Sequence, residues 1–236
     1  MGTYSLRRVA QYARYHYTAQ RKNYLSVMFT CVAFPVLFGI LSHELSVVEG
    51  ISTAIYLFGG IGFAVRTTFA MRHRGTKIME CSLPVSNAER MTFMVLNLAV
   101  MFPLFVTFTA NISLLAAAPF DYYEVNVWEV MRDVTHNFLC DWRLYVMIQI
   151  IASVSLFLNI VARRSLFVAY LGAFLGVMVF FGAVARISVH ILMNVNPFFF
   201  ESFEVSDNVA RVIYIMIPVV FYALGYWALR RRQMRW

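Results

Sequence analysis

Six long apolar stretches alternate with polar segments along the chain. Each is close to the length of about 20 residues that a helix needs to cross the hydrocarbon core of a bilayer. Five of the six contain no charged residue, and the second contains only Glu49, in its first turn. The pattern predicts an all-α integral membrane protein with six transmembrane helices, over residues 24–41, 47–65, 91–118, 144–162, 165–185 and 212–229.

Basic residues are unevenly distributed over the segments that connect these stretches. The N-terminal segment, the second and fourth connections and the C-terminal segment hold 16 of the 20 lysines and arginines. Because basic residues near the ends of spans are retained in the cytoplasm, both termini are predicted to be cytoplasmic. The predicted cytoplasmic side also has two acidic residues, so its net charge is +14. The other side has four basic and ten acidic residues, and its net charge is −6. Short basic segments beside spans are typical of orientation signals and contacts with anionic lipids, and they argue against nucleic-acid binding.

Composition agrees with a membrane protein. Hydrophobic residues make up 61% of the chain and charged residues 14%, against about a quarter charged in soluble domains. The spans and connections use nearly all 236 residues, so a single transmembrane domain over 1–236 is predicted, with no separate soluble catalytic domain. The N-terminal segment is polar and basic, and the first span is expected to act as an uncleaved insertion signal.

The first 23 residues have a helical pattern of their own. Leu6, Val9, Ala13 and Tyr17 recur at helical spacing among arginines. A basic helix with an apolar side lies naturally among lipid headgroups, which predicts an N-terminal interfacial amphipathic helix over 1–23. The alternative is a plain positive flank that only orients the first span.

The second connection, 66–90, is the largest on the cytoplasmic side. Pro84 interrupts any helix that precedes it, because the residue before a proline avoids the helical region. Ser86 and Glu89 then form the pattern of a capping box at the start of the third span. The segment is therefore expected to contain a short helix of its own.

Two outer connections are also unusual. In the third, 119–143, an apolar face recurs at helical spacing and predicts an amphipathic helix on the outer membrane surface. The fifth, 186–211, is too apolar for a water-exposed loop and too short to span, which favours a re-entrant or interfacial segment. The residues of the helical face in the third connection are Val127, Met131, Val134 and Phe138.

Several kinds of chemistry have no candidate residues. No carboxylate lies in the middle of a span, where a proton relay would need one. The phosphate-binding pattern GxxxxGK[ST] and the catalytic patterns HExxH and GxSxG do not occur. The three cysteines have neither a disulfide framework nor metal-ligand spacing. The sequence therefore predicts no catalytic, cofactor or metal site and no enzymatic activity in this chain.

The spans contain scattered polar, glycine and proline residues. Buried amides are costly in lipid unless they meet partners, so they either line a polar translocation path or form hydrogen bonds between helices, and the second interpretation is favoured. A GxxxG pattern allows close approach of another helix, in this chain or in a second copy. Prolines are expected to kink their spans. The amides are Asn97, Asn111, Gln149 and Asn159; the glycines are Gly172 and Gly176; the prolines are Pro35, Pro103 and Pro218.

The whole pattern resembles the membrane-spanning permease subunits of type-2 ABC exporters. The segment 83–90, LPVSNAER, is similar to the LPVS-x-x-E-[KR] stretch of several such permeases before their third span. Residues 222–227, YALGYW, followed by three arginines, resemble their last span and tail. The basic N-terminal helix, six spans and the apolar fifth connection agree with this architecture, whereas the large third connection departs from it.

The resemblance implies a mechanical role. In that family, the connection between spans two and three carries a coupling helix that docks into a separate ATPase subunit, which binds ATP and Mg²⁺. Carried onto this chain, the ATPase-coupling residues are Met71, Arg72, Arg74, Lys77, Ile78, Met79, Leu83 and Pro84. The implied assembly pairs two permeases, identical or paralogous, in a bacterial inner membrane.

Other classes of function remain open at this point. A non-transporting membrane scaffold or assembly module would use the glycines of the fifth span to bind other helices. A self-contained channel or carrier would conduct without ATP, and an intramembrane enzyme would need a catalytic constellation that the chain does not display.

Overall fold

The described part of the chain is all-helical. The computed structural model describes residues 4–68, 83–123, 125–162, 168–172 and 207–233, and within these ranges no strand occurs. Residues 168–172 form a short helical stretch. The named elements are α1 (Leu6–Ala19), α2 (Arg21–Ser42), α3 (Leu45–Thr68), α5 (Asn87–Leu96), the π-helical segment η2 (Asn97–Met101), α6 (Phe102–Ala117), the 3₁₀ segment η3 (Ala118–Phe120), α7 (Val127–Cys140), α8 (Trp142–Val161) and α11 (Asp207–Gln233).

Four helical units in the described residues are long and apolar enough to cross a membrane. They are α2, α3, α8 and the continuous unit Asn87–Phe120, which comprises α5, η2, α6 and η3. They correspond to the first four predicted spans, except that α8 ends at Val161, one residue before the end of the predicted span, and they are consistent with a multi-pass membrane protein. Their outer surfaces carry large exposed apolar side chains such as Phe29, which is 74% exposed, as expected of surface that faces lipid.

The last two predicted spans are described less completely. The predicted span 165–185 lies outside the described residues except for the helical stretch 168–172. The predicted span 212–229 lies within α11, which begins at Asp207, inside the range predicted as the fifth connection. The total of six spans and the cytoplasmic side of the termini stay predictions.

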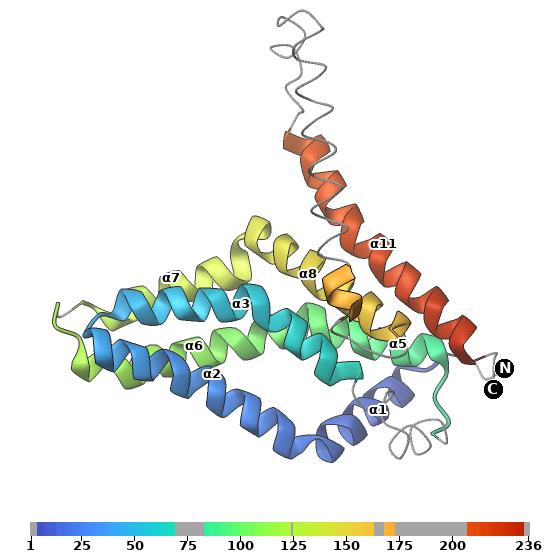
Figure 1. Ribbon diagram of the computed structural model, residues 1–236, viewed down its shortest axis with the longest axis horizontal. Coiled ribbons are helices and arrows are strands. Elements are labelled where there is room, and N and C mark those ends of the chain that lie inside the picture. The colour runs from blue at the N-terminus through green and yellow to red at the C-terminus, as the bar shows by residue number, and fades with distance from the viewer. Residues whose placement is uncertain (1–3, 69–82, 124, 163–167, 173–206, 234–236) are drawn as a thin grey trace, which may run out of the picture.

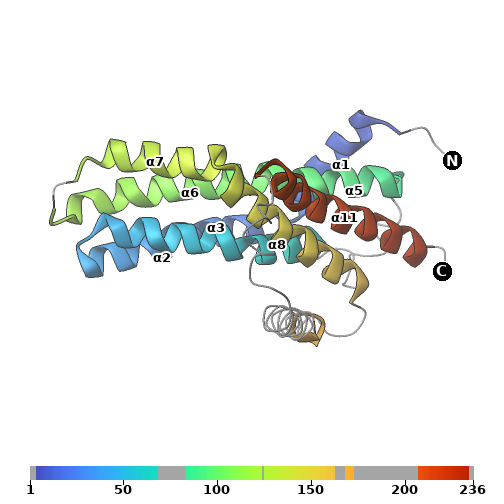
Figure 2. The same cartoon turned by 90° about the horizontal axis from the view of Figure 1, so that it is seen from above.

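The helices form a bundle around α3, which packs against α2, α6 and α8 (Figure 1). α8 lies between α3 and α11, and α7 returns along α6 in both views (Figures 1 and 2). α1, α5 and the last turns of α11 lie together at one end of the bundle, which we call the α1 end. The turn between α2 and α3 lies at the opposite end.

Two helical hairpins are tied together at this opposite end. His43 ends α2 in the left-handed conformation, with φ of 56°. Its carbonyl accepts a hydrogen bond of 3.0 Å from the backbone N–H of Tyr122. The N–H of Leu45 donates to the carboxylate of Asp121 at 3.2 Å, which satisfies one of the free donors at the start of α3. The polar groups of one turn therefore pair with those of the other.

Two of the helices predicted outside the spans form, and the short helix predicted within the second connection lies outside the described residues. α7 buries Val134 and Phe138 against the bundle and exposes Arg132 and Asp133, which confirms the predicted amphipathic helix. Its predicted position on the outer membrane surface is untested, and in the structure its apolar face packs mainly on α6.

α1 is also helical, but its buried side differs from the predicted one. Leu6 is 69% exposed, whereas Val9, Tyr12 and His16 are buried. Of the other residues on the predicted side, Ala13 and Tyr17 are partly buried against the core. The interfacial position of α1 stays a prediction.

The core of the bundle is built around stacked aromatic rings. Tyr56 of α3 and Phe138 of α7 stack with their centroids 4.3 Å apart, and both are buried. The Tyr56 hydroxyl donates to the carbonyl of Phe138, close to the end of α7. Stacked aromatic pairs contribute about 0.5–1.5 kcal/mol beyond the area that they bury, and with the hydrogen bond this contact holds α7 against α3.

The π-helical segment η2 follows from a proline. In a regular helix the carbonyls of Leu98 and Ala99 would accept from the N–H groups of Phe102 and Pro103. The Phe102 N–H donates to the carbonyl of Asn97 instead, and a proline has no N–H to donate. Two adjacent carbonyls are therefore left without helical partners. Pro103 was predicted to kink its span, and the structure shows a π-helical segment directly before it, whereas Pro35 and Pro218 lie inside α2 and α11.

Side chains of α8 satisfy both carbonyls. Gln149 donates to the Leu98 carbonyl at 3.3 Å, and the Tyr145 hydroxyl donates to the Ala99 carbonyl at 2.9 Å. The other end of the Gln149 amide accepts from the hydroxyl of Tyr222 on α11 at 2.9 Å. The irregular backbone is therefore the point at which the long third span is joined to α8 and α11, as expected where water cannot replace a missing donor.

This arrangement predicts a coupled pair of substitutions. Tyr145→Phe is expected to lower the free energy of unfolding by about 1–2 kcal/mol, because it leaves the Ala99 carbonyl without a donor. In a Pro103→Ala background the new N–H can serve that carbonyl, so the same substitution should cost much less. Unfolding by SDS in mixed micelles measures both costs, with Tyr214→Phe on the exposed side of α11 as the matched control. Equal costs in the two backgrounds would show that the proline is not the cause.

Candidate functional site

One buried carboxylate, Glu89, organises the α1 end of the bundle. Ser86 caps α5: its hydroxyl accepts from the Glu89 N–H at 3.3 Å, and the Glu89 side chain accepts from the Ser86 N–H at 2.8 Å. This is the reciprocal capping box that the sequence predicts. It fixes the backbone where the second connection enters α5.

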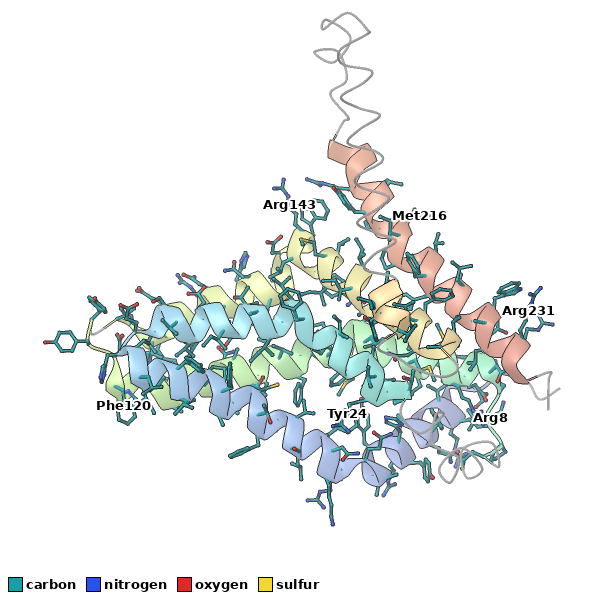
Figure 3. The ribbon with its side chains drawn as sticks, viewed as in Figure 1. Arg8, Tyr24, Phe120, Arg143, Met216 and Arg231 are labelled. Carbon is teal, nitrogen blue, oxygen red and sulfur yellow. The ribbon has the colours of Figure 1, made fainter. Side chains whose placement is uncertain are left out.

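The same carboxylate also holds the start of α1. Its other oxygen accepts from the backbone N–H of Ser5 at 2.8 Å and from Arg8 Nε at 2.9 Å, with Arg8 Nη2 at 2.7 Å. Glu89 is fully buried, and the Arg8 side chain is one-third exposed. The hydrogen bond to Glu89 raises the pKa of the Arg8 guanidinium. A buried charge is costly unless it is paired and hydrogen-bonded, and all of these donors serve that need. Arg8 is labelled in Figure 3, at the α1 end of the bundle.

We call Ser5, Arg8, Ser86 and Glu89 the carboxylate clamp. It joins residues more than 80 positions apart in the chain. A carboxylate at the first turn of a helix is also favoured by the helix dipole, and here it serves the N-termini of α1 and α5 at once. The clamp therefore makes α1 and the end of the second connection one mechanical unit.

Apolar contacts complete the docking of α1. The ring of Phe93 on α5 meets Tyr12 edge to face, with centroids 5.1 Å apart, and lies 4.9 Å from the ring of His16. His16 Nε2 lies 3.1 Å from the hydroxyl of Tyr24 on α2. Burial lowers the pKa of His16 to about 4, so its imidazole is neutral at physiological pH. α1 is thus held by both a charged and an uncharged contact.

A polar cluster centred on Asn97 joins four elements below α1. The Asn97 amide donates to Thr67 of α3 at 2.7 Å and lies 3.5 Å from the hydroxyl of Tyr24 on α2. Its oxygen accepts from the hydroxyl of Tyr17 on α1. Asn97 is buried and begins the π-helical segment, so the cluster connects α1, α2 and α3 to the irregular part of the third span.

All four amides proposed to line a translocation path form hydrogen bonds between elements. Asn97 and Gln149 do so as described above. Asn111 donates to Thr135 of α7 at 3.0 Å, and Asn159 donates to Tyr170 at 3.2 Å. The interhelical role is therefore observed, whereas a role in translocation stays a prediction.

The other predicted site residues are described only in part. Six of the coupling residues lie outside the described residues: Met71, Arg72, Arg74, Lys77, Ile78 and Met79. Leu83 is partly buried against the core and Pro84 is exposed, directly before the capping box. Gly172 is exposed, and a Cβ added there would meet nothing within 4 Å, while Gly176 lies outside the described residues.

Sequence reasoning found half of the carboxylate clamp. The spacing of Ser86 and Glu89 is a local signal, and it correctly predicts the capping box. Arg8 is one of several arginines in the N-terminal segment, and nothing in its immediate sequence distinguishes it. Its partner is set by the packing of α1 on α5.

In the described ranges, no group of three or more His, Cys, Asp or Glu side chains is placed to hold a metal ion. No protein-family model, no curated protein and no solved structure matches this chain.

Proposed function

We propose that this chain is the membrane-spanning permease subunit of a type-2 ABC exporter. A separate ATPase subunit would bind ATP and Mg²⁺ and dock on the second connection, and a second permease, identical or paralogous, would complete the assembly in a bacterial inner membrane. The proposal rests first on the sequence resemblance described above. The same resemblance assigns residues 71–84 as the segment that docks on the ATPase.

The observation that supports this role best is the carboxylate clamp. A docking segment can move transmembrane helices only if its ends are rigidly attached to them. The segment begins after Thr68, the last residue of α3, and the preceding Thr67 accepts a hydrogen bond from Asn97. It ends at Ser86, whose N–H donates to Glu89, and Glu89 also binds the start of α1. A push on the segment would therefore act on α1, α3 and α5 together, and such transitions require elements that move as units between discrete arrangements.

In this proposal the four amides Asn97, Asn111, Gln149 and Asn159 belong to the moving parts. Each now forms a hydrogen bond between elements, so a second arrangement of the helices would have to exchange those bonds for others. A path lined by these amides would exist only in that second arrangement. Differential binding of nucleotide to the two arrangements would drive the exchange.

The test is co-purification from the native host in mild detergent, with mass spectrometry of what accompanies the chain. The expected result is an ABC-type ATPase, which is lost when residues 72–84 are replaced by a Gly/Ser linker. A matched control replaces residues 122–126 at the opposite end, and this variant should retain the ATPase. Failure to recover any ATPase, under conditions that preserve a known transporter complex, would contradict the proposal and favour the non-transporting scaffold.

A further inference from the structure

A cavity of about 280 Å³ lies between α2, α3 and α6, next to the α1 end of the bundle. Its walls are mostly aromatic and aliphatic. They include Tyr24 and Cys31 of α2, Gly62 and Phe63 of α3, and Phe102 of α6, with Arg66 of α3 also in the lining. Protein interiors are normally packed as densely as organic crystals, so an apolar space of this size in a bundle requires an explanation.

The cavity exists because two helices separate. The buried residues of α2 are Pro35 and Gly39, both in its second half. α2 therefore packs closely near the turn with α3 and diverges from α3 toward α1 (Figure 1). On the α3 side, Gly62 is exposed, and a Cβ added there would meet nothing within 4 Å. The space is thus open at the side of a helix that is apolar enough to face lipid.

Polar groups in the lining lie at one end only. Tyr24 is one turn from the start of α2, and Arg66 is in the last turn of α3, so both lie near the α1 end. Figure 3 labels Tyr24. Arg21 and Lys22 begin α2 at the same level. The interior toward Cys31 and Val106 is apolar. A matching ligand is long and apolar with an anionic group at one end.

We propose that this cavity binds one acyl chain of an anionic phospholipid, with the phosphate of the headgroup near Arg66. The volume corresponds to on the order of ten methylene-sized groups, which suits part of a single chain and not a whole lipid. The side opening lets the chain enter from the bilayer. The site does not depend on the exporter role, because any membrane protein with this cavity would meet such lipids.

The experiment uses the full chain in nanodiscs of phosphatidylcholine containing a trace of phosphatidylglycerol with a diazirine in its acyl chain. After irradiation, mass spectrometry is expected to find the label on cavity-lining peptides of α2, α3 and α6. A phosphatidylcholine probe with the same acyl chain should label these peptides several-fold less. Uniform labelling over all lipid-facing helices, or equal labelling by both probes, would overturn the proposal.

Gly62→Leu places a side chain in the cavity and is expected to reduce this labelling several-fold, because the leucine occupies space that the acyl chain would fill. Gly50→Leu is the matched control: it lies on the same helix, is exposed and also has open space, yet it is outside the cavity lining, so labelling should not change. Arg66→Gln should abolish the preference for phosphatidylglycerol. Unchanged labelling of Gly62→Leu would refute the site.

A measurement on the unaltered chain covers the case in which a variant does not fold. Cys31 lies in the cavity and Cys140 is exposed elsewhere, and both are free thiols. Raising the phosphatidylglycerol content of the nanodisc should slow alkylation of Cys31 by a membrane-permeant maleimide several-fold and leave Cys140 unchanged. Equal effects on the two thiols would contradict occupancy of the cavity.

Discussion

Glu89→Gln is expected to release α1 from the bundle while α5 remains capped. Glutamine can still accept from the Ser86 N–H, because capping boxes use either residue at this position. It has no charge to hold Arg8, and its single side-chain oxygen cannot serve both helices. Hydrogen exchange of the α1 amides should therefore accelerate by an order of magnitude or more, whereas the amides of α5 should keep their protection.

Glu89→Ala is expected to have the larger effect. It removes the partner of Arg8 and of Ser5, and it also removes half of the capping box. Ser86→Ala isolates the loss of the cap, which costs about 1 kcal/mol in general. The difference between these variants in thermal unfolding therefore measures how much of the stability of this end depends on the attachment of α1.

Two neighbouring arginines provide the matched control for this prediction. Arg7 and Arg8 have the same side chain on the same helix, but Arg8 contacts Glu89 and Arg7 is exposed. Arg8→Gln should reproduce the faster exchange of α1, and Arg7→Gln should not. The double variant with Glu89→Gln should be no worse than Glu89→Gln alone, since both substitutions break one contact. Additive effects of the two would show that the ion pair does not hold α1.

Much of the fold could be predicted from local pattern. The first four spans follow from the length and apolarity of their stretches, and α7 follows from the spacing of Val134, Phe138 and their neighbours. The cap of α5 follows from Ser86 and Glu89. Each of these features is decided within about 20 consecutive residues, which is why a single sequence is sufficient to predict it.

The contacts between elements could not be predicted in the same way. Asn97 and Gln149 are recognisably unusual in an apolar stretch, but their partners Thr67 and Tyr222 are 30 and 73 residues away. The π-helical segment needed one more inference: a proline in the third span leaves carbonyls that another helix must satisfy. The sequence indicates that Pro103 disturbs its helix, and only the packing of α8 shows which side chains donate to the carbonyls that are left free.

Gly39→Ala is expected to be among the most destabilising single-methyl additions in the chain. Gly39 is buried where α2, α3 and α6 meet, and a Cβ there would overlap the Cγ2 of Val48 and lie 3.3 Å from the Cβ of Ala117. Val48 is fully buried, and its branched side chain has little rotamer freedom in a helix. The helices must therefore move apart, at a cost of about 1–3 kcal/mol. Unfolding by SDS in mixed micelles measures this loss.

Gly50→Ala on α3 should have the opposite sign. A Cβ at Gly50 meets nothing within 4 Å, so alanine should stabilise the helix by about 0.5–1 kcal/mol. Val48→Ala removes the atom that Gly39→Ala would strike, so the double variant should be more stable than the sum of the single effects predicts. If the Gly39→Ala variant were instead as stable as the Gly50→Ala variant, α2 and α3 would not approach each other as closely at Gly39 as the structure shows. The cavity near Tyr24 would then lose its explanation, because it depends on α2 being held at this end and diverging at the other.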